Sequence, residues 1–165
     1  MNEIVLKMAI DSIDIKLLDL LQTDASLSNQ SLAEKVHISP PTCLRRVKAL
    51  RDSGLIERQI AILNTEKLSV LQGDGLTALV EITLDRQGAE HLEAFEAKVV
   101  QDRAVQQCYR VSPGPDFCLV IYCADMPAYL ALANRLFTQD ANVRNVKAFF
   151  SIKRAKFQTK IDLKM

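Results

Sequence analysis

The strongest chemical signal in the chain is a cluster of cations that follows two adjacent prolines. In HISPPTCLRRVKALRDSGLIERQIAIL, which begins at His37, the segment from Ser39 to Arg51 holds four Lys and Arg residues and no acid. An arginine near the start of a recognition helix can form two hydrogen bonds with guanine, and lysines or hydroxyls on its flanks suit phosphates. The sequence therefore predicts contacts with double-stranded DNA from Ser39, Pro40, Thr42, Arg45, Arg46, Lys48 and Arg51.

These cations need a helix that presents them to solvent, and the surrounding pattern predicts one. Ser39 is expected to cap this helix, and Pro40 falls in its first turn, where a missing N–H does no harm. Gly54 is the expected helix end, and LIERQIAIL at 55–63 alternates enough for a short strand or a two-stranded wing. The apolar stripe that faces inward is expected to consist of Cys43 or Leu44, Val47 and Leu50.

Two further helices are predicted before this one. IDSIDIKLLDLLQTDA has helical spacing of its apolar residues, and Ser28 is the expected N-cap of the segment NQSLAEKV. With a tight turn at 37–38, residues 1–63 predict a winged helix-turn-helix. A charged helix face is often only a solvated surface, and this alternative remains for the cations. The combination of turn, cap and wing favours DNA binding.

The second part of the chain predicts a different architecture. The pattern weakens over 64–75, where Gly73-Asp74-Gly75 marks a hinge, and residues 76–165 form the second domain. The expected order is strand 76–84, helix 87–101, strand 105–112, strand 116–124, helix 127–139 and strand 143–154. Asp125 is the expected cap of the second helix, whose inward stripe is expected to consist of Leu130, Ala133 and Leu136 or Phe137. This βαββαβ order is typical of a ferredoxin-like sandwich, so the fold class is α+β.

Both helices of such a sandwich cover one face of the sheet and leave the other uncovered. Alternate apolar positions are expected on the uncovered face, among them Val80, Ile82, Leu119, Ile121 and Phe149 or their neighbours. An apolar face of that size usually meets a partner. A homodimer that packs sheet against sheet is the economical solution.

Composition excludes several other classes of protein. The formal charge of +1, 48% apolar and 25% charged residues are typical of a soluble globular protein. No apolar run approaches the roughly 18 residues of a membrane span, and Glu3 and Lys7 interrupt the amino-terminal segment, so no signal peptide is expected. Four cysteines without a CxxC pair predict reduced thiols in the cytoplasm, and two distant histidines predict no metal site and no cofactor.

The motifs together resemble the leucine-responsive and asparagine-responsive regulators, the Lrp/AsnC family. The resemblance lies in ISPPTCLRRVKALRDSGLIERQIAILN and continues through VEITL at 80–84, QCYRVSPGPDF at 107–117 and DMPAYLAL at 125–132. It implies a transcription regulator, not an enzyme, with a DNA-binding domain and a domain for effector binding and assembly. Dimers that assemble into tetramers or octamers are implied, with a small amino acid bound between dimers.

The resemblance also implies where the effector would bind. The matching positions in the loop before the third strand are Ser112, Gly114, Asp116 and Phe117, and further candidates are Met126, Phe149, Phe150 and Ser151. The chain departs from the family pattern at Pro113, where a loop glycine is usual, and at Ala148, where a threonine is common. His37 stands where the family usually has glycine, a position that can favour positive φ.

Alternatives remain open for several features. SPGPD at 112–116 could be only a turn, with Asp116 bonded to local backbone, or Asp116 could also accept from an amino-acid ammonium. The cations of the tail SIKRAKFQTKIDLKM are taken as a solvated strand end in preference to a path for wrapped DNA. Two rival functions are an architectural nucleoid protein without effector and a tetrapyrrole decarboxylase of related fold, for which only His91 is available in the second domain.

Overall fold

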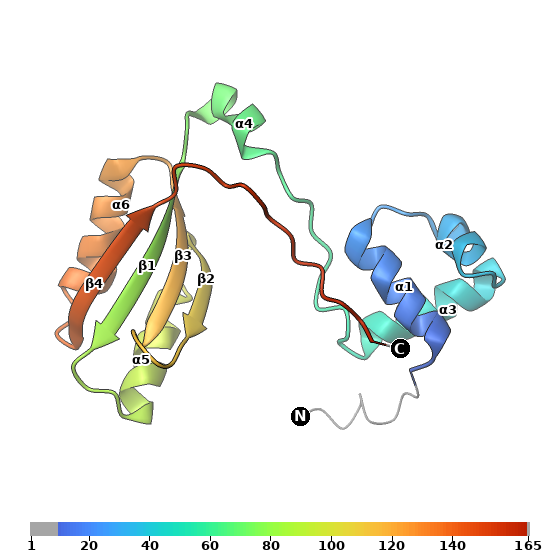
Figure 1. The fold of residues 1–165 in the computed structure, drawn as a ribbon, viewed down its shortest axis with the longest axis horizontal. Coiled ribbons are helices and arrows are strands. Elements are labelled where there is room, and N and C mark those ends of the chain that lie inside the picture. The colour runs from blue at the N-terminus through green and yellow to red at the C-terminus, as the bar shows by residue number, and fades with distance from the viewer. Residues whose placement is uncertain (1–9, 165) are drawn as a thin grey trace. The chain divides into compact units, whose positions relative to one another are not determined.

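The computed structural model describes residues 10–164, which form two compact units (Figure 1). Among the described residues, one unit consists of 10–62 together with the tail 156–164, and the other of 63–155. Each unit has its own cluster of buried apolar side chains. Residues 1–9 and 165, which the predicted domains include, lie outside the described part.

The first unit is a bundle of three helices, as predicted. They are α1 (Ser12–Thr23), α2 (Asn29–Lys35) and α3 (Pro40–Asp52). The inward stripe of α3 consists of Cys43, Val47 and Leu50, and these side chains pack with Leu17, Leu21 and Leu32. Leu44, the alternative to Cys43, is 60% exposed. The Ser28 side chain accepts a hydrogen bond from Ser31 N, which confirms the predicted cap of α2.

The turn between α2 and α3 is a Schellman motif. His37 N–H donates to Glu34 O at 3.3 Å and Ile38 N–H donates to Ala33 O at 3.0 Å. The motif requires a left-handed residue after the C-cap, and His37 has φ of +57°. The sequence therefore holds a histidine at a position that favours glycine, as the family pattern suggested.

The segment that follows α3 differs from expectation. α3 ends at Asp52, and Gly54, the expected helix end, follows the C-cap with φ of +78°. The strand predicted within 55–63 does not form, and residues 57–64 have no regular secondary structure. A strand needs a neighbour for its backbone groups, and the described part of the first unit offers none. The hinge, in turn, contains a helix that the sequence did not predict, α4 (Thr65–Gln72), capped by the Asn64 side chain.

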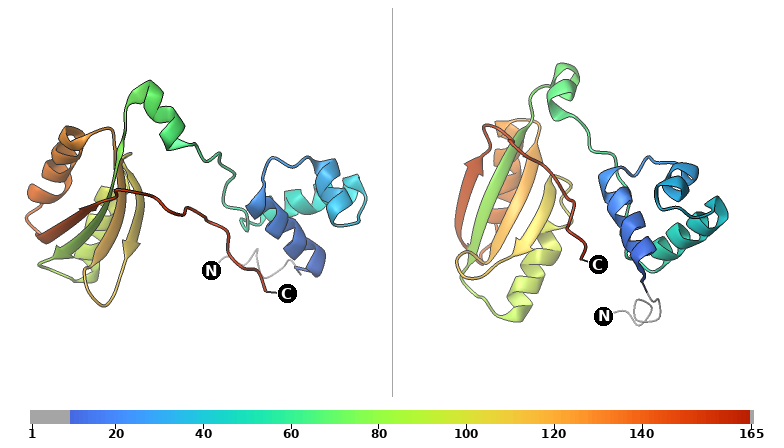
Figure 2. Two further views of the ribbon diagram at one scale, coloured as in Figure 1. Left: turned by 45° about the horizontal axis from the view of Figure 1, so that its top comes forward. Right: turned by 45° about the vertical axis from the view of Figure 1, so that its right-hand side comes forward.

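The second unit is the predicted βαββαβ sandwich. Its elements are β1 (Leu76–Leu84), α5 (Ala89–Val99), β2 (Val105–Arg110), β3 (Phe117–Cys123), α6 (Met126–Ala133) continued by the π-helical turn η2 (Asn134–Thr138), and β4 (Val143–Phe150). The sheet is antiparallel with the order β2-β3-β1-β4. Both helices lie on the same face of the sheet (Figures 1 and 2). The Asp125 side chain accepts from Ala128 N, which confirms the cap of α6.

The side chains expected on the uncovered face of the sheet mostly lie on the face that the helices cover. Val80, Ile82, Leu119 and Ile121, which were expected on the uncovered face, are at most 1% exposed and pack with Phe95 and Phe137 of the helices. The uncovered face carries their neighbours instead: Leu79, Glu81, Cys118, Val120 and Phe149. Of the residues named for that face, only Phe149 lies there. Apolar residues occur on both sides of these strands, so alternation alone could not give the phase.

The buried stripe of α6 is also displaced from the predicted one. Leu130, which was expected to point inward, is 59% exposed, while Tyr129 and Leu132 are buried. The π-helical turn adds a residue to the helical repeat and brings both Leu136 and Phe137 into the core. Tyr129 also meets Phe150 of β4 edge to face, with ring centroids 4.9 Å apart.

Candidate nucleic-acid interface and effector region

The start of α3 is held in place by polar contacts. Ser39 is the N-cap residue, but its hydroxyl pairs with the Thr42 hydroxyl at 2.8 Å and not with a helix N–H. The Asn29 side chain donates to Pro40 O at 2.8 Å and so ties the start of α2 to the start of α3. Pro40 and Pro41 have no N–H, and Cys43 N–H donates to Ser39 O at 2.9 Å, so within this described turn Thr42 N–H is the group left for a phosphate.

Three of the predicted DNA-contacting cations lie on the exposed side of α3. Arg45, Lys48 and Arg51 are all exposed. Arg51 donates to the Gln59 side chain at 2.9 Å, whereas Arg45 and Lys48 form no ion pair or hydrogen bond with any residue in 10–164. These side chains are available to a partner with negative charge. Their role at DNA stays a prediction, as do those of Ser39, Pro40 and Thr42.

Arg46 has a different environment from its neighbour Arg45. Its Nη1 lies 2.9 Å from Asp14 Oδ1 of α1 and 2.9 Å from Asp11 Oδ2 at the cap of α1. The hydrogen bond to Asp14 raises the pKa of the Arg46 guanidinium, although partial burial opposes this. Hydrogen bonding from Asp14 N, aided by Arg46, lowers the pKa of the Asp11 carboxyl. No pattern in the sequence indicates this contact between α1 and α3.

The aspartate of the loop before β3 forms its hydrogen bonds within its own subunit. The Asp116 carboxylate accepts from Leu84 N at 2.7 Å and from the Gln87 side chain at 3.2 Å. Its backbone N–H donates to Ile82 O at 2.8 Å. The loop itself contains a cis Ser112–Pro113 bond and Gly114 with φ of +125°. The carboxylate therefore bonds the end of β1, 32 residues away in sequence, and not the local backbone that one reading expected.

The other predicted effector residues lie at the opposite end of the sheet. Met126 begins α6 after the end of β3, and Phe149, Phe150 and Ser151 are at the end of β4, beside the start of β1. β1 runs between the two groups from Ala78, opposite Phe150, to Leu84, whose N–H meets Asp116. At 3.3 Å a residue, this distance is about 20 Å. One subunit does not bring the two groups together.

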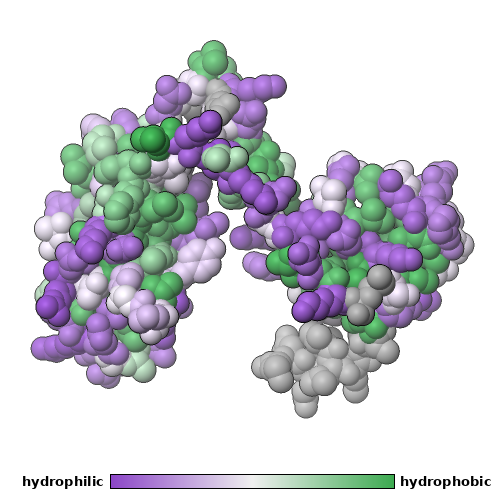
Figure 3. All heavy atoms as spheres, viewed as in Figure 1, coloured by the Kyte–Doolittle hydropathy of each residue, from purple (hydrophilic) through white to green (hydrophobic). Residues whose placement is uncertain are grey.

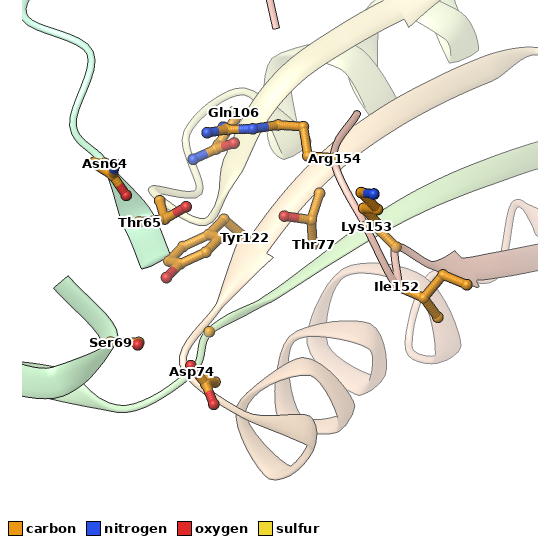
Figure 4. Close-up of a pocket in the computed structure, with 12 residues that line it drawn as sticks. Asn64, Thr65, Ser69, Asp74, Thr77, Gln106, Tyr122, Ile152, Lys153 and Arg154 are labelled. Carbon is orange, nitrogen blue, oxygen red and sulfur yellow. The ribbon is translucent and has the colours of Figure 1, made fainter. Parts of the chain in front are cut away.

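A polar pocket of about 450 Å³ lies beside the start of β1, in the second unit (Figure 4). Its lining includes the hydroxyls of Thr65, Ser69, Thr77, Tyr122 and Ser151, the amides of Asn64 and Gln106, and the charged side chains of Asp74, Lys153 and Arg154. Of these, only Ser151 was predicted as a site residue. The others come from α4, from three strands and from the segment after β4, so no local motif could identify them.

The described residues offer little for metal or thiol chemistry. No group of three His, Cys, Asp or Glu side chains within 10–164 is placed to hold a metal ion. All four cysteines are free, and burial raises the pKa of the Cys43, Cys108 and Cys123 thiols. Nor does any helix within 10–164 have the length and apolar composition required to cross a membrane.

Comparison with known proteins places both units in one family. Residues 77–161 match the model of the Lrp/AsnC ligand binding domain, and residues 10–57 match a winged helix-turn-helix DNA-binding model. A helix-turn-helix transcriptional regulator of Haemophilus influenzae is 34% identical over 145 residues, which span 88% of this chain and 84% of that protein. The chain belongs to the Lrp/AsnC family.

Other members of the Lrp/AsnC family support the same assignment. The leucine-responsive regulatory protein of Haemophilus influenzae is 35% identical over 148 residues, covering 90% of this chain and 87% of that protein. A Neisseria meningitidis transcriptional regulator, solved as a complex with L-methionine, superposes with a TM-score of 0.81 at 30% identity, covering 93% of this chain and 97% of that one. The protein is thus a DNA-binding transcriptional regulator with a ligand-binding domain of this family, and a purely architectural role is not favoured.

Proposed function

We propose that this regulator binds a defined DNA sequence through α3 as a homo-oligomer, and that a small amino acid modulates the binding. The observation that carries the proposal is the exposed group Arg45, Lys48 and Arg51 on the outer side of α3. A related regulator was solved with L-methionine, which supports an amino acid as the class of effector. Such a protein acts in the cytoplasm and is not an enzyme.

Assembly is supported by the uncovered face of the sheet. Leu79, Tyr109 and Phe149 are each at least 50% exposed there, around an apolar depression of about 360 Å³. In Figure 3 apolar side chains gather over this face of the second unit. A second copy of the chain would bury them by packing sheet against sheet, which gives a dimer with two recognition helices for successive major grooves. Dimers would assemble further into tetramers or octamers.

The effector is proposed to bind between subunits. The loop residues Ser112, Gly114 and Asp116 lie about 20 Å from the group at the end of β4, so a small molecule that touches both must take them from different subunits. The polar pocket beside β1 is the alternative within one subunit. It carries both signs of charge, Asp74 and Lys153, and therefore suits a zwitterion.

Fluorescence anisotropy with a duplex selected by the protein from a random library tests the function. We expect tight binding to that duplex, much weaker binding to a scrambled duplex, and a change on addition of one of the standard amino acids. Equal binding of both duplexes, with no response to any amino acid, would support the architectural role instead. Uptake of an iron tetrapyrrole with a shifted absorption band would contradict the non-enzymatic assignment.

Two variants distinguish the proposed effector positions. Asp116→Asn removes the charge from the loop, and Lys153→Ala removes a cation from the polar pocket. If the effector binds between subunits at the loop, Asp116→Asn weakens the amino-acid response at least tenfold, while Lys153→Ala leaves it within twofold. The reverse result would place the effector in the pocket. DNA affinity without effector, measured for both variants, separates loss of response from loss of folding.

A further inference from the structure

Arg46 is bound to the amino-terminal end of α1 by two carboxylates. Its Nη1 lies 2.9 Å from Asp14 Oδ1 and 2.9 Å from Asp11 Oδ2. The side chain of Asp14 is only 6% exposed and that of Arg46 is 25% exposed. The Nε of Arg46 is buried and has no partner among residues 10–164. The guanidinium is thus directed toward α1 and largely withdrawn from solvent.

The two carboxylates are themselves fixed by the start of α1. Asp11 Oδ1 accepts from Ile13 N at 2.9 Å and from Asp14 N at 3.0 Å, while Asp14 Oδ2 accepts from Asp11 N at 3.2 Å. Each acid therefore uses one oxygen in this capping box and the other on Arg46. Because the capping box holds both acids, neither can follow the guanidinium if Arg46 turns toward DNA.

Release of Arg46 would leave a buried charge without a counter-charge. Asp14 is the more buried of the two acids, and removing one partner of a buried ion pair is strongly unfavourable because the other charge stays desolvated. A single phosphate contact on the DNA surface is solvated and screened by salt, so it stabilises the guanidinium less than the buried ion pair does. Arg45, one residue earlier and exposed, has no such competing partner within the described chain.

We propose that Asp14, with Asp11, withholds Arg46 from DNA and so leaves Arg45 as the one base-reading member of the arginine pair. Asp14 is then a positioning residue that determines specificity in two ways. It fixes the recognition helix α3 against α1, and it removes one cation that would otherwise bind any phosphate. The proposal replaces the DNA contact that the sequence predicts for Arg46, and it rests on DNA binding through α3.

The salt dependence of binding tests the proposal, because each phosphate contact contributes about 0.9 to the slope of log affinity against log salt. Anisotropy titrations with the selected and the scrambled duplex would compare the wild type, Asp14→Asn, Arg46→Gln and the double variant. We expect Arg46→Gln to keep the wild-type slope. Asp14→Asn leaves the guanidinium with only the half-exposed Asp11, a pairing that salt screens. The slope should therefore steepen by about 0.9, and binding of the scrambled duplex should tighten by about threefold to tenfold.

Two controls complete the experiment. In the double variant the slope returns to the wild-type value, because no cation is left to reach a phosphate. The matched variant Arg45→Gln weakens the selected duplex by about 5- to 150-fold and lowers the ratio of the two affinities. Circular dichroism checks that each variant is folded. Should Asp14→Asn not fold, the slope of Arg46→Gln decides alone, because a lost phosphate contact would lower it by about 0.9.

The opposite results overturn the proposal. A slope reduced by about 0.9 in Arg46→Gln, or a loss of selected-duplex affinity equal to that of Arg45→Gln, would place Arg46 on the DNA. If folded Asp14→Asn has the wild-type slope and the wild-type affinity for the scrambled duplex, then Asp14 does not keep Arg46 from DNA. Failure of the wild type to bind any duplex would overturn the proposed function as well, so the two failures are distinguishable.

Discussion

The side-chain amide of Gln22 pairs with both backbone groups of Ile161. Its Nε2 donates to Ile161 O at 3.2 Å, and Ile161 N–H donates to its Oε1 at 2.9 Å. Lys160 adds an ion pair with Asp19 at 2.8 Å and a hydrogen bond to the Thr23 hydroxyl at 3.1 Å. The tail, which the sequence suggested to be a solvated strand end, is therefore bound to α1 as part of the DNA-binding unit.

Loss of the hydrogen bonds between Gln22 and Ile161 should destabilise the first unit. Gln22→Ala removes two partly solvated hydrogen bonds, so we expect the free energy of unfolding to fall by about 1 kcal/mol. Urea unfolding of the full chain measures the change. A chain that ends at Ala155 provides the control, because Gln22→Ala should have no further effect there. An equal loss in both chains would mean that Gln22 stabilises α1 without the tail.

Arg45→Ala should reduce sequence preference. A bidentate contact with a base contributes about 1–3 kcal/mol of discrimination, so we expect the selected duplex to bind more weakly by that amount and the scrambled duplex to change less. Competition anisotropy with single-base variants of the selected duplex would find the position at which preference is lost. Uniform weakening across all duplexes would instead assign Arg45 to a phosphate.

Lys48→Ala should act on every duplex alike. Lysine is a compact charge that suits phosphate, so its loss should weaken both duplexes by a similar factor and reduce the salt slope by about 0.9. Titrations at four or more salt concentrations provide the slope. Lys35→Ala, on α2, is the matched control outside α3, and a slope lowered as much by it would indicate a general effect of net charge.

Asp140 should make the second unit sensitive to acid. Partial burial by itself raises the pKa of this carboxyl, but hydrogen bonds from Lys98 and from Asn142 N–H outweigh it and hold the pKa below its ordinary 3.8. A lowered folded-state pKa stabilises the protein above the unfolded value, and the stabilisation is lost as pH falls through the folded value. Asp140→Asn should therefore lower the free energy of unfolding by about 1 kcal/mol at pH 7, since the Lys98 ion pair at 2.8 Å is lost.

The wild type and Asp140→Asn should differ less in free energy of unfolding below pH 3.8, where the wild-type carboxyl takes up its proton. Urea unfolding at several pH values from 7 down to the acid limit of folding would follow it. A difference that stays constant with pH would show that the variant acts through altered packing and not through charge.

His37→Gly should stabilise the turn before α3. A residue other than glycine pays about 1 kcal/mol for a left-handed conformation, and the greater freedom of glycine in the unfolded chain offsets part of the gain. We expect the free energy of unfolding to rise by about 0.5 kcal/mol. His37→Ala, which keeps the Cβ, should show no such rise. Equal stabilisation by both variants would implicate the exposed imidazole and not the backbone.

Local patterns predicted much of this molecule because burial and capping repeat at fixed intervals. Cys43, Val47 and Leu50 recur with the helical period, and a helix that buries one face has few other solutions. Ser28 and Asp125 were predicted as caps because their side chains satisfy N–H groups only a few residues away. The βαββαβ order followed from such signals.

Features that depend on partners distant in sequence were decided only by the tertiary structure. Val80 and Leu79 are both apolar, and the packing of α5 and α6 alone determines that Val80 is the buried one. The helix α4 was missed for a related reason, since its exposed Val70 and Leu71 form no buried stripe.

Arg45 and Arg46 show most clearly what the sequence determines and what only the tertiary structure determines. The sequence determined that this protein carries a basic recognition helix and belongs with the DNA-binding regulators. Adjacent arginines have the same chemistry, so no pattern in the sequence could separate them. Successive residues point about 100° apart on a helix, and that rotation brings only Arg46 against the acids of α1. The structure alone therefore decides which arginine remains exposed to a partner.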